Sequence, residues 1–190
     1  MNLLFIGDVV GQSGCDFLES RMYKLKREYD IDVTVVNGEN SAQGNGITPQ
    51  SYRQLLNMGA DVVTTGNHSF RRREAEELYD TNEQLLRPAN YPEGVMGHGV
   101  TYIDMCPYKI AVVNLMGTMY MEAVENPFNY VDKLLESIDT PNIIVDFHAE
   151  ATSEKKAMGF YLQKRCTAVL GTHTHVQTAD ETILGGHTAY

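Results

Sequence analysis

The sequence predicts an α/β fold in which strands and helices form one layered domain. Short runs of aliphatic and β-branched residues alternate along the chain with longer amphipathic helical patterns, as is typical of α/β proteins. Most of the apolar runs end in glycine or polar residues, at the position where open α/β sheets bind their ligands. A length of 190 residues suits a single domain, and the chain contains no internal repeat, low-complexity tract or linker.

The first half of the chain is predicted to contain three strands, each connected to the next by a helix. The expected elements are a strand at 3–6, a helix from Ser13 to Tyr29, a strand at 32–36, a helix from Thr48-Pro49 to Gly59 and a strand at 62–65. A short helix is then expected to open at Arg71-Arg72-Arg73. Three arginines beside a site could steer phosphate, but glutamates at helical spacing favour a solvent-exposed ion-pair face.

The second half is predicted to begin with a loop and a hairpin and then to return to alternating strands and helices. The expected elements are a loop at 86–99, a hairpin-like pair of strands at 100–104 and 110–114, an irregular segment at 116–125, a helix from Asn126-Pro127 to Ile138, a strand at 142–145, a helix around 157–162 and a strand at 167–170. We interpret His98 as incidental, and the methionines and tyrosine of residues 116–125 as packing residues rather than a cofactor site.

Composition restricts the class of protein. Hydrophobic residues make up 43% of the chain and charged residues 21%, which is ordinary for a globular protein. A net charge of -10 argues against an extended nucleic-acid surface, although a metal cluster could still attract phosphate locally. No apolar run has the length of a membrane span, and the first residues lack the basic start of a signal peptide, so we expect a cytoplasmic protein without membrane association. The isolated Cys15, Cys106 and Cys166 fit buried free thiols in a reducing compartment better than disulfides.

Polar residues that can bind metals or transfer protons follow five separate apolar runs. They are Asp8 after the first strand, Glu39 and Asn40 after the second, Asn67 and His68 after the third, His148 after the strand at 142–145, and His173 and His175 after the strand at 167–170. Each has an ordinary alternative, and Asp8, for example, could equally cap a turn or helix. Because parallel strands present their carboxyl ends at one edge of a sheet, we expect the whole set at one edge of one sheet.

The glycines after the first strand do not form a dinucleotide-binding loop. Gly7, Gly11 and Gly14 lack the GxGxxG spacing. Asp8, directly after the strand, would also repel a pyrophosphate unless a cation lay between them. Asp8 is therefore a candidate metal ligand.

The donor set suits a metal site and includes the groups that a site with two ions would need. It contains carboxylate, amide and imidazole groups without thiolates, which suits iron, manganese or zinc ions rather than a structural cysteine–zinc site. A carboxylate such as Glu39 can bridge two cations. The two imidazoles of the segment from His173 to His175 can diverge to two different ions.

Seven segments match, in order, the motifs of a known family. They are Phe5-Ile6-Gly7-Asp8-Val9-Val10-Gly11, Asn37-Gly38-Glu39-Asn40, Gly66-Asn67-His68, Arg87-Pro88-Ala89-Asn90, Asp146-Phe147-His148-Ala149-Glu150, Ala151-Thr152-Ser153-Glu154 and Gly171-Thr172-His173-Thr174-His175. This set, spread over nearly the whole chain, resembles the YmdB-type bacterial metallophosphoesterases, a branch of the calcineurin-like superfamily. The resemblance implies a metallophosphoesterase sandwich of mixed β-sheets flanked by helices, with the metal site at the carboxyl ends of strands.

The resemblance also implies a role for each candidate residue. One metal ion would be held by Asp8, Glu39, Asn40 and His175, and the other by Glu39, Asn67, His148 and His173. His68 would be the proton donor. The wider superfamily normally opens with Asp-x-His, whereas Val10 stands at that histidine position here, and Asn40 is the natural replacement ligand. Asp146 or Glu150 could orient a ligand, with a salt bridge or a surface position as the alternative.

The implied activity is the hydrolysis of small phosphodiesters. The family resemblance suggests cyclic nucleotides, the 2',3'-cyclic ones foremost and the 3',5'-cyclic ones next. Two metal ions, iron foremost with manganese or zinc as alternatives, would make hydroxide available at neutral pH and neutralise the phosphoryl oxygens. His68 would then protonate the departing alkoxide.

Members of this family usually continue past the equivalent of Gly185–Tyr190 with further strands and with segments used in oligomer contacts. Residues 1–190 are therefore expected to form a single domain without the C-terminal part usual in the family, as a fragment or as a naturally shortened member, and to be a candidate homo-oligomer. The second hypothesis is a catalytically weak, metal-bound regulatory or scaffolding protein. A serine or cysteine hydrolase would need a GxSxG elbow or a recognisable cysteine context, which the chain lacks.

Overall fold

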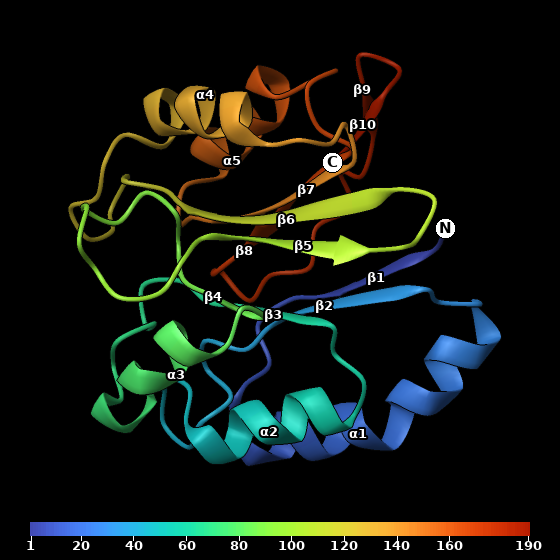
Figure 1. The fold of residues 1–190 in the computed structure, drawn as a ribbon, viewed down its shortest axis with the longest axis vertical. Coiled ribbons are helices and arrows are strands. Elements are labelled where there is room, and N and C mark those ends of the chain that lie inside the picture. Colours follow the sequence, from blue (N-terminus) through green and yellow to red (C-terminus); the bar gives the residue numbers. More distant parts are fainter.

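The computed structural model describes residues 1–190 and confirms the α/β fold, with two β-sheets packed against each other and helices outside them (Figure 1). One sheet has four strands, all parallel, in the order β1-β2-β3-β4. The other has six strands in the order β5-β6-β7-β8-β10-β9, with β5 and β9 antiparallel to their neighbours. Helices α1 to α3 cover the outer face of the four-stranded sheet, and α4 and α5 cover that of the six-stranded sheet.

The elements alternate along the chain much as the sequence predicts. They are β1 (Leu3–Ile6), α1 (Gly11–Glu28), β2 (Val33–Asn37), α2 (Pro49–Asn57), β3 (Val62–Thr64), a 3-10 turn (Arg73–Ala75), α3 (Glu76–Thr81), β4 (Leu85–Leu86), β5 (Val100–Asp104), β6 (Lys109–Met116), α4 (Pro127–Ser137), β7 (Ile143–His148), α5 (Thr152–Tyr161), β8 (Ala168–Thr172), β9 (Ile183–Leu184) and β10 (Thr188–Ala189). None of the helices combines the length and the hydropathy that crossing a bilayer requires.

Strand residues alternate between two apolar layers, which explains the β-branched runs. In β2, Val35 belongs to the core between the two sheets, where it joins Ile144 of β7. Its neighbour Val36 belongs to the layer beneath α1 and α2, together with Leu18 and Leu55. A third layer packs β6 and β7 against α4 and α5. Both faces of the central strands are therefore buried, as continuous apolar runs predict.

Two predicted helix starts are confirmed by their caps. The Thr48 hydroxyl accepts a hydrogen bond from the Ser51 amide, the Ser51 hydroxyl accepts one from the Thr48 amide, and Pro49 occupies the first helical position of α2. The Asn126 side chain caps α4 in the same way by accepting from two backbone amides.

The structure corrects several sequence expectations. Strands β7 and β8 run on to His148 and Thr172, because a parallel ladder pairs Met116, His148 and Thr172 in register. The two-residue strands β4, β9 and β10 were outside the prediction, because two residues are too few to show a period. Cys106 is exposed in the turn between β5 and β6, whereas Cys15 and Cys166 are buried.

The predicted ion-pair face of the three arginines is wrong. None of the ion pairs in the structure involves Arg71, Arg72 or Arg73. The Arg72 guanidinium instead donates to the carbonyl oxygens of Gln43 and Asn45. It therefore fixes the loop that follows Asn40.

Candidate metal centre

The eight candidate residues meet between the two sheets rather than at the edge of one. The four-stranded sheet supplies the residues that follow β1, β2 and β3, and the six-stranded sheet supplies His148 at the end of β7 and the two histidines that follow β8. The expectation of a single sheet is wrong because local periodicity does not reveal which strands pair. The expectation that strand ends bring these residues together agrees with the structure, as the contacts below describe.

His148 lies at the centre of the most compact group. Its Nε2 atom is 3.1 Å from Glu39 Oε1, 3.1 Å from Asn67 Oδ1 and 3.1 Å from His173 Nδ1. His148 and Glu39 are completely buried. Ligand atoms of Glu39, His148 and His173 all lie within 4.8 Å of one another, which is the spacing of a metal-binding group.

The hydrogen bonds behind His148 determine which of its nitrogens carries a lone pair. Asp146, when ionised, can only accept, so the Thr172 hydroxyl donates to it at 2.7 Å. The Thr172 oxygen must then accept from His148 Nδ1, 2.9 Å away. Neutral His148 therefore presents an unprotonated Nε2 to the Glu39 carboxylate and the Asn67 carbonyl. The lone pairs of these atoms point toward one another and repel. A bound cation would offset this repulsion, so the residues fit a metal ion.

A second, more open group contains Asp8 and His175. Asp8 Oδ2 accepts a hydrogen bond from the His173 amide at 2.9 Å. Asp8 Oδ1 is buried without a hydrogen-bond partner and lies 3.4 Å from His175 Nε2. An orphaned carboxylate oxygen beside an imidazole also fits a cation.

The Asn40 side chain contacts Glu39 and His68. Its amide donates to Glu39 Oε1 at 3.1 Å, and its carbonyl oxygen lies 2.9 Å from His68 Nδ1. The His68 amide donates to Glu39 Oε2 at 3.1 Å. The ring of His68 is thus held from one side, and its Nε2 makes no hydrogen bond. The side chain is 27% exposed, so this free nitrogen is accessible from solvent.

Backbone conformation at the site is unusual. His173 and His175 have φ angles of 97° and 52°, in the region that residues with side chains rarely adopt. Such outliers persist where surrounding contacts hold them, and they cluster at functional sites. Gly66 is required for a different reason: a Cβ atom there would overlap the His148 ring and the Glu39 carboxylate. This accounts for the glycine of the Gly66-Asn67-His68 segment.

A buried carboxylate joins the two sheets beneath the site. Asp146 of β7 accepts hydrogen bonds from Asn37 of β2, Thr64 of β3 and Thr172 of β8. Sequence reasoning named Asp146 as a candidate for orienting a ligand but missed Asn37, Thr64 and Thr172. Their only signal was a polar residue inside an otherwise apolar strand. Glu150, the other candidate, lies 3.0 Å from His173 Nε2.

Burial and mutual contacts shift the pKa values of the central groups. Burial opposes ionisation of Glu39, but hydrogen bonds from His148 and His68 outweigh it and lower the pKa of Glu39. Burial also opposes protonation of His148, yet Glu39 raises its pKa overall. Burial, followed by the charge of His148, lowers the pKa of His173. Burial raises the pKa of Asp146 to about 6. Glu39 therefore stays ionised, and a cation that binds beside it has to displace the proton that Glu39 favours on His148.

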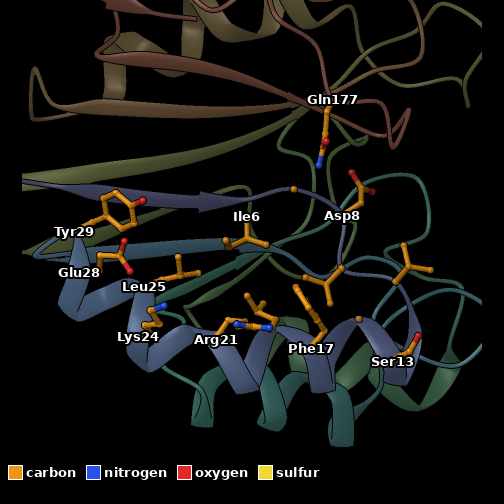
Figure 2. A pocket seen from close by; sticks show the side chains of 15 residues that line it. Ile6, Asp8, Ser13, Phe17, Arg21, Lys24, Leu25, Glu28, Tyr29 and Gln177 are labelled. Atoms are coloured by element: carbon orange, nitrogen blue, oxygen red, sulfur yellow. The ribbon is translucent and has the colours of Figure 1, made fainter.

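A cavity of about 990 Å³ runs along α1 and meets the candidate site at one end (Figure 2). Asp8 and Gln177 lie at that end, and Phe17, Arg21 and other residues of α1 line the remainder. Of the candidate metal and proton-transfer residues, only Asp8 lines it. This cavity is consequently an extension of the site and not the site itself.

The chain is similar to proteins of one family over almost its whole length. The family described as YmdB-like protein matches residues 4–190. The chain is 47% identical to a 2',3'-cyclic-nucleotide 2'-phosphodiesterase of Bacillus subtilis, covering 100% of this chain and 73% of that protein. It is 34% identical to a putative phosphatase/phosphodiesterase of Mycoplasma genitalium, covering 95% of this chain and 66% of that protein.

Two solved structures share the fold closely. A hypothetical protein from Thermus thermophilus has a TM-score of 0.95 at 40% identity, covering 100% of this chain and 74% of that one. A phosphatase from Mycoplasma pneumoniae has a TM-score of 0.94 at 33% identity, covering 99% of this chain and 69% of that one. The structure of a protein described as a putative 5'-nucleotidase from Staphylococcus aureus, at 17% identity and a TM-score of 0.63, shares the fold alone.

Proposed function

The chain belongs to the family of YmdB-like proteins, and from this premise we propose that it is a metal-dependent phosphodiesterase acting on 2',3'-cyclic nucleotides. The observation that carries the proposal is the convergence of three potential ligand atoms on His148 Nε2, each at 3.1 Å. The Bacillus subtilis relative bears the name of this activity, and the Mycoplasma relatives are named as putative phosphatases or phosphodiesterases. Cyclic 3',5' diesters are the second substrate to test.

The proposed centre holds two metal ions. Glu39, Asn67, His148 and His173 form one ligand group, while Asp8, Asn40 and His175 join Glu39 in the other. Iron is the first candidate, and manganese and zinc are the alternatives for such oxygen and nitrogen donors. When bound, the ions supply Lewis acidity, which lowers the pKa of water and neutralises phosphoryl oxygens.

The protein's own part in the reaction is to hold the donors and to move a proton. Water adds to phosphorus, the bond from phosphorus to one ribose oxygen breaks, and that oxygen needs a proton as it leaves. We assign this transfer to His68, because its Nε2 is free while Nδ1 is held beside Asn40 and Glu39. An imidazole suits proton transfer near neutral pH.

A regulatory role without turnover is not favoured, since the relatives of known name are enzymes. The cytoplasmic location and the formation of a homo-oligomer stay predictions.

The proposal is tested by metal analysis together with hydrolysis of 2',3'-cAMP. We expect about two metal ions per purified chain and turnover that a chelator abolishes and added metal restores. His98→Ala is the matched control, because the His98 ring contacts only the Glu83 carbonyl and lies outside the candidate group. Full metal occupancy without hydrolysis of any cyclic phosphodiester would overturn the proposed activity, and absence of bound metal would overturn the proposed centre.

A further inference from the structure

The loop between β6 and α4, residues 117–125, leaves the six-stranded sheet beside the candidate metal centre; we refer to it as the rim loop. Strand β6 ends at Met116, which pairs in register with His148. The Gly117 amide then donates to the His148 carbonyl oxygen at 2.9 Å. The rim loop therefore starts against the backbone of a candidate ligand.

A single buried side chain holds both ends of the rim loop. The Asn90 amide donates to the carbonyl oxygens of Met116 and Glu125, both at 2.8 Å. Its Oδ1 accepts from the Met116 amide at 2.9 Å, and its backbone carbonyl accepts from the Glu125 amide at 2.9 Å. Asn90 is completely buried, and its three side-chain hydrogen bonds all go to the backbone at the two ends of the loop.

A buried carboxylate fixes the first turn of the rim loop. Glu154 of α5 accepts from the Thr118 amide at 2.9 Å, the Thr118 hydroxyl at 3.1 Å and the Met119 amide at 3.2 Å. Burying a charged group is costly unless hydrogen bonds compensate it. Asn90 and Glu154 end the two family-like segments that carry no candidate ligand, Arg87–Asn90 and Ala151–Glu154. Both segments thus position the rim loop.

The loop so fixed displays one aromatic ring to solvent. Tyr120 is 87% exposed, whereas Met121 beside it packs against the core. The interpretation of this tyrosine as a packing residue is therefore wrong. Its φ angle of 64° is one that non-glycine residues rarely adopt, and such strain points to a functional role.

A second aromatic residue, Tyr91, packs between the anchor of the rim loop and the segment that follows His68. The Tyr91 ring lies edge-on to Phe70, two residues after His68, with centroids 5.5 Å apart. Burial raises the pKa of Tyr91 to about 12, and the carboxylates of Glu122 and Glu39 contribute in the same direction. Tyr91 directly follows Asn90, which holds the rim loop, and its ring packs against Phe70, so it connects the rim loop with the segment that carries His68. Three peptide steps separate Gly117 from Tyr120, so the two Cα atoms are at most about 11 Å apart, and Tyr120 stays near the residue that contacts His148.

We propose that Tyr120 binds the nucleobase of the substrate by stacking. This inference rests on the proposed function, which places a cyclic nucleotide with its phosphate at the metal centre and leaves its base to extend outward. An exposed, rigidly mounted aromatic ring is the group that binds a base face, because every nucleobase offers a π-surface. The same side chain contributes nothing to holding the phosphate.

The kinetic test compares two substrates on four proteins, one of which is a control variant. With 2',3'-cAMP, Tyr120→Ala should raise KM about tenfold with little change in kcat, the loss expected for one base–aromatic stack, and Tyr120→Phe should behave as the unmodified chain. With methyl ribofuranoside 2',3'-cyclic phosphate, which lacks a base, Tyr120→Ala should leave KM unchanged. The matched control is Tyr23→Ala, another highly exposed tyrosine (73%), which lies on α1.

The outcomes separate the two proposals. If the unmodified chain hydrolyses neither substrate, the proposed function fails. If it hydrolyses both and Tyr120→Ala keeps the KM for 2',3'-cAMP, or raises KM equally for the base-free diester, base stacking by Tyr120 is overturned.

A binding measurement gives a readout independent of turnover. The chain has no tryptophan, so Tyr120→Trp introduces a single indole. Adenosine monophosphate should quench its fluorescence, and ribose phosphate at the same concentration should not. Equal responses to the two ligands would overturn the assignment.

Discussion

The two groups of candidate ligands differ in how closely the fold already brings their donor atoms together. The inner group is Glu39, Asn67, His148 and His173, and the outer group is Asp8, Asn40 and His175. In the inner group, three donor atoms lie 3.1 Å from His148 Nε2. In the outer group, His175 is 44% exposed and 3.4 Å from Asp8 Oδ1, and Asn40 is hydrogen-bonded to Glu39 and His68.

The difference follows from where the residues lie in the fold. His148 is the last residue of β7, and the ladder with β6 and β8 fixes its backbone. The chain of hydrogen bonds through Thr172 to Asp146 fixes its ring. His175 lies three residues beyond β8 on a segment with left-handed backbone angles. We infer that the inner group is formed before metal binds, whereas the outer group reaches its final geometry with the metal.

The largest effect is expected from His148→Ala. Removing the imidazole takes away the atom on which the inner group converges and leaves the buried Glu39 carboxylate without its histidine partner. We expect loss of the inner metal and a fall in kcat/KM of at least about 10³-fold, because catalysis by the ions is worth several kcal/mol. Metal analysis and kinetics on 2',3'-cAMP measure both. A variant that keeps two metals and near-normal turnover would contradict the place given to His148, and His98→Ala supplies the control.

His68→Ala should separate chemistry from metal binding. We expect kcat to fall about 10²- to 10⁴-fold, the usual contribution of a proton donor, while the metal content stays that of the unmodified chain. A substrate whose leaving group needs no proton, such as a p-nitrophenyl diester, should lose much less activity. If both substrates lose activity equally, the His68 ring acts by holding Asn40 through Nδ1 and not as an acid, because the alanine variant keeps the backbone amide that donates to Glu39.

The strand-end donors could be predicted from the sequence, because each follows a recognisable apolar run. Asp8, Glu39 and His148 are visible in this way from local pattern alone, and the family resemblance arranged them into two groups. The pairing of strands into two sheets could not be predicted, since Val35 and Ile144 have the same local pattern whether their strands share a sheet or face each other.

The buried polar residues that contact Asp146 could not be predicted from the sequence for a different reason. Thr64 and Thr172 look like ordinary strand residues, because threonine is favoured in β-structure whether or not its hydroxyl makes a buried hydrogen bond. Only the three-dimensional convergence on Asp146 gives them a role. Tyr120 was misjudged because an aromatic residue among methionines resembles a packing cluster in sequence.

Asp146→Asn should weaken the inner group without removing a ligand. An amide cannot accept from Asn37, Thr64 and Thr172 as the carboxylate does, so Thr172 is no longer obliged to accept from His148. We expect metal affinity to fall about 10- to 100-fold, the range for partners that orient a ligand. Thr172→Val should have a similar effect, and Thr167→Val, which removes hydroxyl contacts at the opposite end of the β7 and β8 ladder, is the matched control. Competition with a chelator measures the affinities. Unchanged affinity in both variants would show that the ring of His148 is fixed by other contacts.

The smallest effect on the stability of the fold is expected from His175→Ala. This variant also tests the difference between the inner and outer groups most directly. In the metal-free chain this half-exposed side chain contributes little, so the free energy of unfolding should change by no more than about 0.5 kcal/mol. The metal content should nevertheless fall from about two ions to about one, because the outer group loses its imidazole while the inner group keeps all of its donors. Chemical denaturation of the metal-free protein and metal analysis of the loaded protein measure the two quantities. Loss of both ions would mean that the groups form together, and a large loss of metal-free stability would mean that the outer group, like the inner one, is built into the fold before metal arrives.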